Sequence, residues 1–135
     1  MSEKVVSFEG DSDKKLANFP KEVLEKFVQD LELMRYGMEP LSASKPMNGL
    51  GKGVRELKKN GRPAYRLVYV IKGNVIYVLH AFSKTSGGTD KKHEVTIKKR
   101  FSAIYLVLAV LFVVGLFQPP LALFLKLNLF QFDAT

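Results

Sequence analysis

Three apolar runs separated by short turns constrain the fold of this chain more than any other feature. The runs are Val54–Lys58, Ala64–Ile71 and Val75–Phe82, and each has the length of a strand. Asn60-Gly61 separates the first two runs and Lys72-Gly73-Asn74 separates the last two, and these residues favour tight turns. The pattern therefore predicts an antiparallel meander of three consecutive strands.

The N-terminal part predicts one further strand and two helices. Lys4–Phe8 alternates like a strand, and Asp11 or Ser12 can cap a short helix after it. Pro20 suits the first position of a second helix, and Gly37 suits its left-handed end. We expect the apolar stripe of this second helix to pack on the sheet; it comprises Val23, Leu24, Phe27, Leu31 and Met34.

The segments around the meander complete the predicted order. Residues 39–53 contain two prolines and three glycines, which favours a loop, and the glycine pair near residue 87 favours another. Lys91–Arg100 then reads as a helix. The order β-α-α-β-β-β-α predicts an α+β domain over residues 1–100 with a small antiparallel sheet.

Charge is distributed unevenly along the chain, whose formal net charge is +8. Residues 1–44 contain six Lys or Arg and nine Asp or Glu, whereas residues 45–100 contain fourteen Lys or Arg and three Asp or Glu. A positive half beside a mildly negative half indicates a face that binds a polyanion, although a solvated lysine-rich surface would give the same count.

Several kinds of site are excluded by residue type. The chain has no cysteine, so it has neither disulfides nor thiolate zinc sites. The two histidines, His80 and His93, and the scattered acids lack metal-ligand spacing, and His93 is expected on the solvent face of its helix. No phosphate-binding glycine loop precedes a helix. We therefore expect neither a metal nor a cofactor.

Charged side chains inside the apolar runs are the candidate site residues. Burying a charge without a partner is costly, so each cation must reach water or a partner. We expect Arg55, Arg66, His80 and Lys84 to converge on one groove, with Glu56, which is the one acid between residues 45 and 89, near Arg66. The structural alternatives are an Arg66–Glu56 pair that holds two strands together, a core position for His80 and a solvated Lys84.

The order of short motifs along the chain resembles a known family. The motifs are Lys45-Pro46-Met47, Gly49-Leu50-Gly51, Gly53, Glu56-Leu57, Tyr65-Arg66, Tyr69 and His80-Ala81-Phe82-Ser83-Lys84. In this order they resemble the phage-derived, HigB-like toxin branch of the RelE/ParE superfamily, over about residues 5–100. The resemblance implies the small RelE-like α+β fold.

The resemblance also implies a function. Toxins of this kind belong to type II toxin–antitoxin systems, cleave messenger RNA on the ribosome without a metal, and are neutralised by a helix-turn-helix antitoxin. It assigns Arg66 and Lys84 to phosphate or transition-state stabilisation and His80 or Glu56 to proton transfer. The residues it assigns to RNA binding are Arg55, Lys52, Lys58, Lys91 and Lys92.

Two other readings stay open at this point. Thr85 and Asp90 stand where the family often has a second lysine and a proline. These departures make the lining of the predicted groove less cationic than in the family. A non-catalytic binder of the gyrase-poison type would share the fold without cutting RNA. An inactive prophage remnant would share the motifs without either activity.

The apolar tail over residues 101–135 departs from the family. Phe101–Phe117 has 17 residues without a charge and follows Lys98-Lys99-Arg100, which is borderline for a membrane span with that basic run on the cytoplasmic side. We expect the helix from Lys91 to run unbroken and to end before Pro119. The tail would hold an otherwise cytoplasmic protein at the inner membrane face, or would be an aggregating, frameshifted end. The N-terminus lacks a signal-peptide apolar region.

Overall fold

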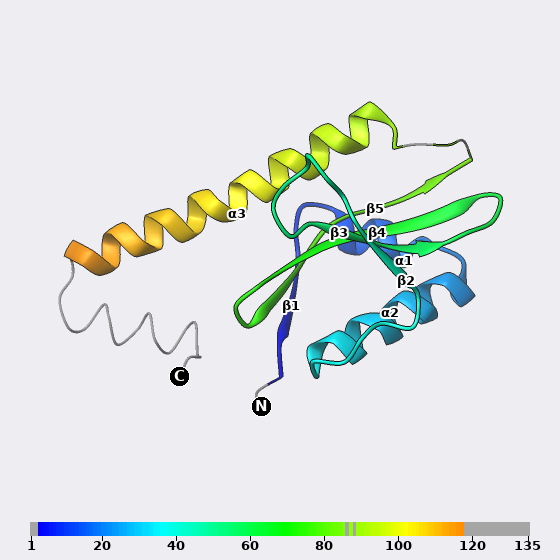
Figure 1. The fold of residues 1–135 in the computed structure, drawn as a ribbon, viewed down its shortest axis with the longest axis horizontal. Coiled ribbons are helices and arrows are strands. Elements are labelled where there is room, and N and C mark those ends of the chain that lie inside the picture. Colours follow the sequence, from blue (N-terminus) through cyan, green and yellow to red (C-terminus); the bar gives the residue numbers. More distant parts are fainter. Residues whose placement is uncertain (1–2, 86, 88, 118–135) are drawn as a thin grey trace.

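The structure is a computed structural model that describes residues 3–85, 87 and 89–117. Its described elements follow one another as five strands and three helices, drawn in Figure 1. In chain order they are β1 (Val5–Phe8), α1 (Ser12–Ala17), α2 (Lys21–Arg35), β2 (Ala43–Pro46), β3 (Arg55–Lys59), β4 (Ala64–Lys72), β5 (Val75–Lys84) and α3 (Lys91–Phe117).

The strands form one sheet in the order β1-β5-β4-β3-β2. β3, β4 and β5 are antiparallel neighbours, so the predicted meander is confirmed. β4 lies in the centre and is buried along most of its length. A mixed α+β fold follows, as the sequence predicts.

Two details of the sheet correct the sequence prediction. β2 lies inside residues 39–53, which were expected to be a loop, and it pairs antiparallel with β3. Its short Ala-Ser-Lys-Pro sequence is mostly exposed at the sheet edge, where a proline is tolerated, so it lacks an apolar strand signal. β1 pairs with β5 in parallel, so the sheet is not wholly antiparallel. A four-residue run carries no information on strand direction, which the connecting helices decide.

A buried aspartate in the C-terminal half of α2, Asp30, holds the chain that leads into β2. The Oδ1 atom of Asp30 accepts hydrogen bonds from the backbone N–H groups of Leu41, at 2.8 Å, and Ser42, at 3.2 Å. Asp30 is fully buried, and its bonds fix the path of residues 41–42 beside the helix. The entry to β2 therefore depends on a side chain from another element, which no local pattern predicts.

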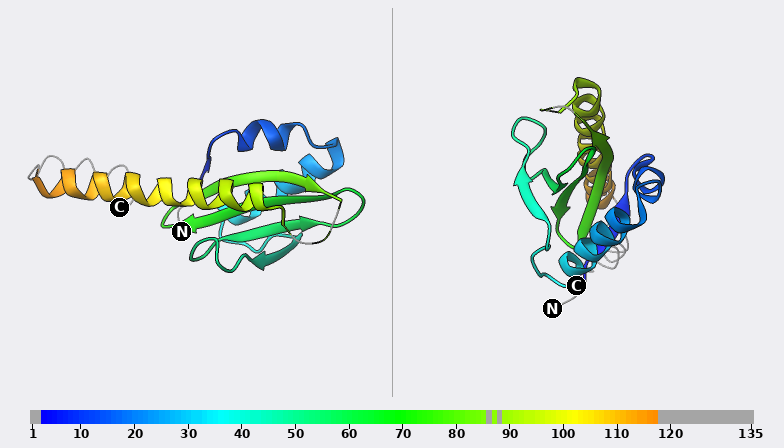
Figure 2. Two further views of the ribbon diagram at one scale, coloured as in Figure 1. Left: turned by 90° about the horizontal axis from the view of Figure 1, so that it is seen from above. Right: turned by 90° about the vertical axis from the view of Figure 1, so that its right-hand side faces the viewer.

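The helices cover both faces of the sheet, as Figure 2 shows from two further directions. On one face, α1 and α2 pack on alternate residues of the strands in the first apolar cluster. Its buried members are Leu16, Val23, Phe27, Leu31, Met34, Leu57, Leu67, Tyr69, Ile76, Val78 and Ala81. The predicted α2 stripe is therefore confirmed, with Leu24 partly buried against the cluster.

On the opposite face, α3 and the segment before β3 form a second apolar cluster. Its buried members are Met47, Leu50, Val54, Val68, Val70, Leu79, Phe82, Ile97 and Ile104. Phe101 and Leu108 pack against it as well. The division expected at residue 100 thus falls inside a packed helix, and a truncation there would remove Ile104 from the core.

Beyond the second cluster, α3 continues past the sheet to Phe117 as one helix (Figure 1). Its distal part exposes apolar side chains, among them Leu106, Val107 and Val110. Across the described part of the chain, no helix combines the length and apolar content needed to cross a membrane, which leaves the predicted span over residues 101–117 without support. The prediction for residues 118–135 lies outside the described residues.

The packing of α2 yields a first testable prediction. Phe27 is fully buried in the first cluster, so Phe27→Ala should lower the free energy of unfolding by roughly 3–5 kcal/mol. Urea unfolding followed by circular dichroism measures the change. The exposed Val28→Ala on the same helix is the control, and an equal loss in both variants would contradict this account of the core.

Candidate functional site

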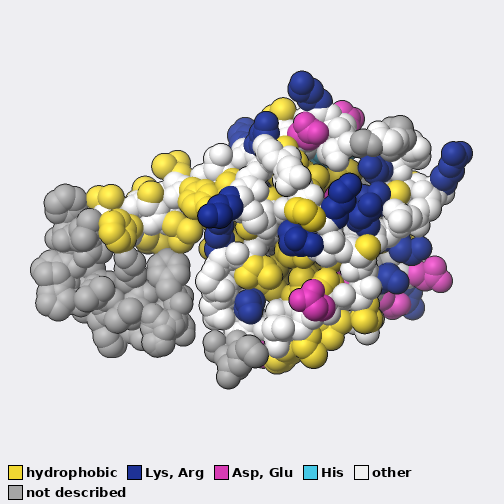
Figure 3. All heavy atoms as spheres, in the orientation of Figure 1, with side chains coloured by type: hydrophobic (Ala, Val, Ile, Leu, Met, Phe, Trp, Pro, Cys, Tyr) yellow, Lys and Arg dark blue, Asp and Glu magenta, His cyan; other side chains and the backbone are white. Residues whose placement is uncertain are grey.

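A cationic cluster lies on the α3 face of the sheet, where strand register brings its members together. Lys45 is opposite Glu56, Lys58 is opposite Arg66, and Lys84 is opposite Ala64 on the next row. Opposed residues of neighbouring strands share a face, so these four cations surround one acid. Figure 3 shows Lys and Arg side chains gathered over the strands in the right-hand part of the molecule.

The pKa of Lys84 reflects the other charges of this cluster. Burial lowers the pKa of Lys84, and the charges of Arg66, Lys58 and Lys45 lower it further, while Glu56 acts in the opposite sense. Like charges at close range disfavour the protonated ammonium. The cluster, defined as Lys45, Lys58, Arg66 and Lys84 around Glu56, is therefore a place where an added anion would relieve repulsion.

Glu56 and Arg66 form a buried ion pair at the centre of the cluster. The Arg66 Nε and Glu56 Oε1 atoms are 3.4 Å apart, and the residues are 5% and 8% exposed. Neither atom has a hydrogen-bond partner among the described residues, because the pair is poorly aligned. Arg66 also donates to the carbonyl oxygen of Tyr65, at 3.0 Å, and to Asn60 Oδ1, at 3.4 Å. Arg66 therefore does pair with Glu56 across two strands, as the structural alternative expected. Arg66 Nε and Glu56 Oε1 still have unused hydrogen-bonding capacity among the described residues.

Arg55 does not join this cluster, which corrects the expected convergence. It is opposite Tyr69, on the face covered by α2, and donates from Nε to Ser44 Oγ at 2.8 Å. Its second bond is to the carbonyl oxygen of Ser44, at 3.0 Å. Arg55 and Glu56 are adjacent in a strand, so they must point to opposite faces.

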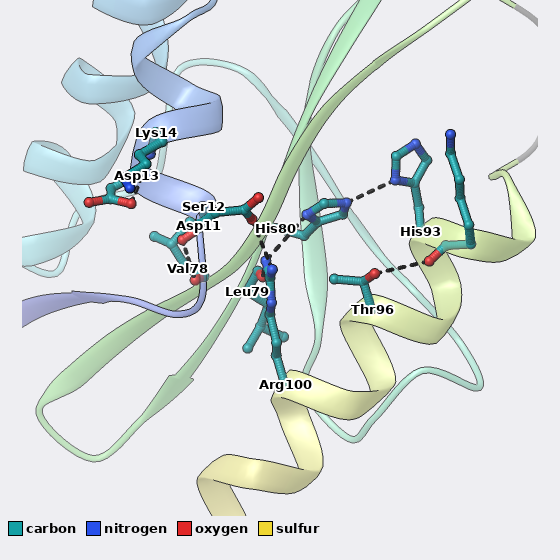
Figure 4. A network of polar contacts seen from close by, with 11 residues as sticks. Asp11, Ser12, Asp13, Lys14, Val78, Leu79, His80, His93, Thr96 and Arg100 are labelled. Carbon is teal, nitrogen blue, oxygen red and sulfur yellow. Dashed lines mark hydrogen bonds and ion pairs between the residues drawn. The ribbon is translucent and has the colours of Figure 1, made fainter.

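His80, on β5, is buried, and both of its ring nitrogens have a polar partner (Figure 4). Its Nε2 is 2.8 Å from His93 Nδ1, and its Nδ1 is 3.4 Å from a guanidinium nitrogen of Arg100. Arg100 also donates to the Leu79 carbonyl oxygen, at 2.9 Å, and to Asp11 Oδ1, at 2.8 Å. Burial, followed by the charges of His93 and Arg100, lowers the pKa of His80 to about 4.

The network fixes the tautomers of both imidazoles. A guanidinium can only donate, so His80 Nδ1 accepts and His80 Nε2 carries the hydrogen. That hydrogen points to His93 Nδ1, so a neutral His93 carries its own hydrogen on Nε2. In Figure 4 that nitrogen points away from His80. His80 is therefore a core residue that orients His93.

The sequence interpretation of His93 is wrong. It is half-buried, its ring stacks on Phe82 with centroids 4.2 Å apart, and burial lowers its pKa. Arg100, which the sequence predicts only as part of the basic run before the apolar tail, also belongs to this network. Their spacing is the signal that could have found them, because His93, Ile97, Arg100 and Ile104 follow one helix face at steps of four, three and four.

The other predicted RNA-binding lysines are dispersed. Lys58 belongs to the cationic cluster, whereas Lys91 and Lys92 are exposed in the first turn of α3. Lys52 is exposed in the segment before β3 and borders a hollow that Arg55 also lines. Within the described residues, no group of three or more His, Asp or Glu side chains could hold a metal ion.

Comparison with protein families identifies the chain's relatives. Residues 14–102 match the family described as "Phage derived protein Gp49-like (DUF891)". The chain belongs to this Gp49-like family. The match spans about two thirds of the chain and contains the cationic cluster and the His80–His93 pair. The predicted phage-derived family is thus confirmed at this level.

Among curated proteins, none matches this chain significantly. Among solved structures, it is similar to a chain in the crystal structure of the toxin–antitoxin complex RelBE2 from Mycobacterium tuberculosis. Sequence identity is 23%, the TM-score is 0.44, and the match covers 64% of this chain and 97% of that chain.

The buried His80 predicts a pH-dependent stability. Its folded pKa of about 4 lies below the unfolded value of about 6.5, so the unfolded chain binds more protons between these pH values. The free energy of unfolding should therefore have its full value above about pH 6.5. It should fall by on the order of 3 kcal/mol as the pH is lowered to 4. His80→Gln should lose this component. Equal pH slopes of wild type and variant in urea unfolding would refute the assignment.

The Glu56–Arg66 pair predicts strong coupling between two substitutions. Glu56→Leu or Arg66→Met alone leaves one buried charge without its partner and should cost roughly 3–5 kcal/mol. The double variant should lose much less than the sum of the two. A double-mutant cycle in urea measures this, and additive losses would mean that the pair contributes no coupling.

Proposed function

We propose that this chain is the toxin of a type II toxin–antitoxin system and cleaves messenger RNA on the ribosome. The observation that carries the proposal is the cationic cluster, in which Lys45, Lys58, Arg66 and Lys84 surround Glu56 on one sheet face. Membership of a phage-derived family and the order of the motifs from Lys45 to Lys84 support it.

The cluster suits RNA cleavage by the neighbouring hydroxyl. The ribose 2′-oxygen attacks phosphorus, the bond from phosphorus to the 5′-oxygen breaks, and a 2′,3′-cyclic phosphate and a 5′-hydroxyl result. A base takes the 2′-hydroxyl proton, an acid gives a proton to the 5′-oxygen, and cations stabilise the extra negative charge between these steps. Side chains of the cationic cluster can supply the base and the cations.

In this proposal the predicted residues take the following roles. The planar guanidinium of Arg66 and the ammonium of Lys84 bind the phosphate oxygens, because a fork and a point charge together match the developing dianion. Glu56, whose Oε1 has no hydrogen-bond partner among the described residues, takes the 2′-hydroxyl proton. His80 is the weaker candidate for proton transfer, because both of its ring nitrogens are engaged.

The partners follow from the same proposal. The ribosome presents the messenger RNA, which places the working protein in the cytoplasm, and a small helix-turn-helix antitoxin neutralises it. Arg55, Lys52, Lys91 and Lys92 lie outside the cluster and would contact flanking RNA or ribosomal RNA through phosphate groups.

The test is expression in bacteria with growth and transcript cleavage as readouts. Arg66→Lys keeps the charge but loses the fork, and Lys84→Ala removes one cation; each should reduce cleavage by roughly 10²–10³. Lys98→Ala, at an exposed position on α3, is the matched control and should cleave normally. Thermal unfolding checks that every variant folds.

Two outcomes would count against the proposal. Full cleavage by a folded Arg66→Lys, Lys84→Ala double variant would reduce the cluster to a structural role. Growth arrest without transcript cleavage in the wild type would favour the non-catalytic, gyrase-poison alternative.

A further inference from the structure

A second polar group of side chains lies on the face of the sheet opposite the cationic cluster. Arg55 donates from Nε to Ser44 Oγ, at 2.8 Å, and from Nη2 to the Ser44 carbonyl oxygen, at 3.0 Å. Ser44 Oγ is also 2.8 Å from the hydroxyl oxygen of Tyr69. Tyr69 is 3% exposed, and Arg55 and Ser44 are half-buried. The three side chains therefore form one connected group across β2, β3 and β4.

This group has more hydrogen-bond donors than acceptors. Nε and Nη2 of Arg55 use one edge of the guanidinium for Ser44, so the hydrogens of Nη1 and the second hydrogen of Nη2 have no partner among the described residues. The hydroxyls of Ser44 and Tyr69 share one hydrogen bond. Whichever hydroxyl donates, the hydrogen of the other has no acceptor in the described part of the chain. A ligand with acceptor oxygens would satisfy these donors.

A cavity of about 500 Å³ borders the group. That volume is in the range of small-molecule sites, which combine apolar lining with a few polar groups. The polar residues that line it are Lys4, Glu39, Ser44, Arg55 and Tyr69, and the apolar ones are Met34, Met38, Pro40 and Ile71, with Gly37 and Gly53 between them. The cavity therefore offers donors for an anion and apolar surface for a hydrophobic body.

We propose that this cavity binds a small organic carboxylate with an apolar body. The free edge of Arg55 presents parallel N–H groups from Nη1 and Nη2, and a carboxylate accepts from such a fork through both of its oxygens. Lys4 and Arg55 against Glu39 leave the lining with a single excess positive charge, which suits a monoanion better than a phosphate dianion. Met34 and Met38 have flexible side chains that adapt to an aliphatic or aromatic body.

The site is organised before a ligand arrives. Two bonds to Ser44 fix the plane of the Arg55 guanidinium, so little further side-chain entropy is lost when an anion binds. If Arg55 only tied β3 to β2, the edge that faces Ser44 would suffice, and neither the free edge nor the cavity would have a use. This site goes beyond the proposed function, in which Arg55 has only a flanking contact to RNA, and its test requires no RNA.

Titration of the full-length protein with three probes, followed by the NMR shifts of backbone amides, tests the site. Phenylacetate combines a carboxylate with an apolar body, acetate has the carboxylate alone, and phenethyl alcohol lacks the charge. Phenylacetate should bind at least about tenfold more tightly than either of the others, because only it uses both parts of the cavity. Its largest shifts should fall on Ser44, Arg55 and Tyr69. Equal affinity for the three probes, or shifts centred on Arg66 and Lys84, would overturn the proposal.

Two matched pairs of variants test the residues themselves. Arg55→Gln removes the fork, whereas Arg62→Gln removes an exposed arginine that does not line the cavity. Met38→Glu adds a negative charge to the lining, whereas Leu41→Glu adds one at an exposed position outside it. Arg55→Gln and Met38→Glu should each bind phenylacetate about tenfold more weakly, and both controls should bind it like the wild type.

The second pair keeps the experiment decisive if the first perturbs the fold. Met38→Glu leaves the bonds among Arg55, Ser44 and Tyr69 in place, and thermal unfolding checks every variant. Unchanged binding by a folded Met38→Glu variant, or an equal loss in the two members of either pair, would show that phenylacetate does not occupy this cavity.

Discussion

The central position of β4 is the constraint on which the rest of the structure depends. Tyr65, Leu67 and Tyr69 face the helices α1 and α2, while Val68 and Val70 face α3. Covering both faces assigns each residue of the neighbouring strands to one of the two faces, because opposed residues share a face. A slip of one residue would exchange the two faces and would place Arg66 in the first cluster. The register of β4 therefore fixes the site as firmly as it fixes the core.

The same register explains why a stable fold contains a strained group of charges. Arg66 and Glu56 are buried on the α3 face because strands β3 and β4 pair there, and Lys45, Lys58 and Lys84 approach from the flanks. A poorly aligned buried pair contributes little to stability. Its cost is offset by the two apolar clusters, and Arg66 Nε, which has no hydrogen-bond partner among the described residues, is the donor that the proposed phosphate binding would use. In contrast, the chain Asp11–Arg100–His80–His93 is well bonded and joins α1, β5 and α3.

Much of the architecture could be predicted because it is local. The apolar stripe of α2 repeats at helical spacing, and the turns at Asn60-Gly61 and Lys72-Gly73-Asn74 separate runs of strand length. The prediction failed for features that depend on contacts between residues far apart in the chain. β2 is held in place partly by Asp30 of α2, and β1 pairs in parallel with β5, although two helices and three strands of the chain lie between them. The half-buried position of His93 depends on β5, which no window around residue 93 contains.

The sequence by itself determined which residues form strands and helices, and which cations interrupt the apolar runs. It also determined that Arg66 and its neighbours in β4 alternate between two faces, because period two is a property of any strand. Only the tertiary structure decided which faces coincide. It joined Lys45, Glu56, Arg66 and Lys84, sent Arg55 to the opposite face, and turned His80 into a support for His93. The physical reason is that register and helix docking are set by burial of side chains far apart in the chain, which local periodicity cannot encode.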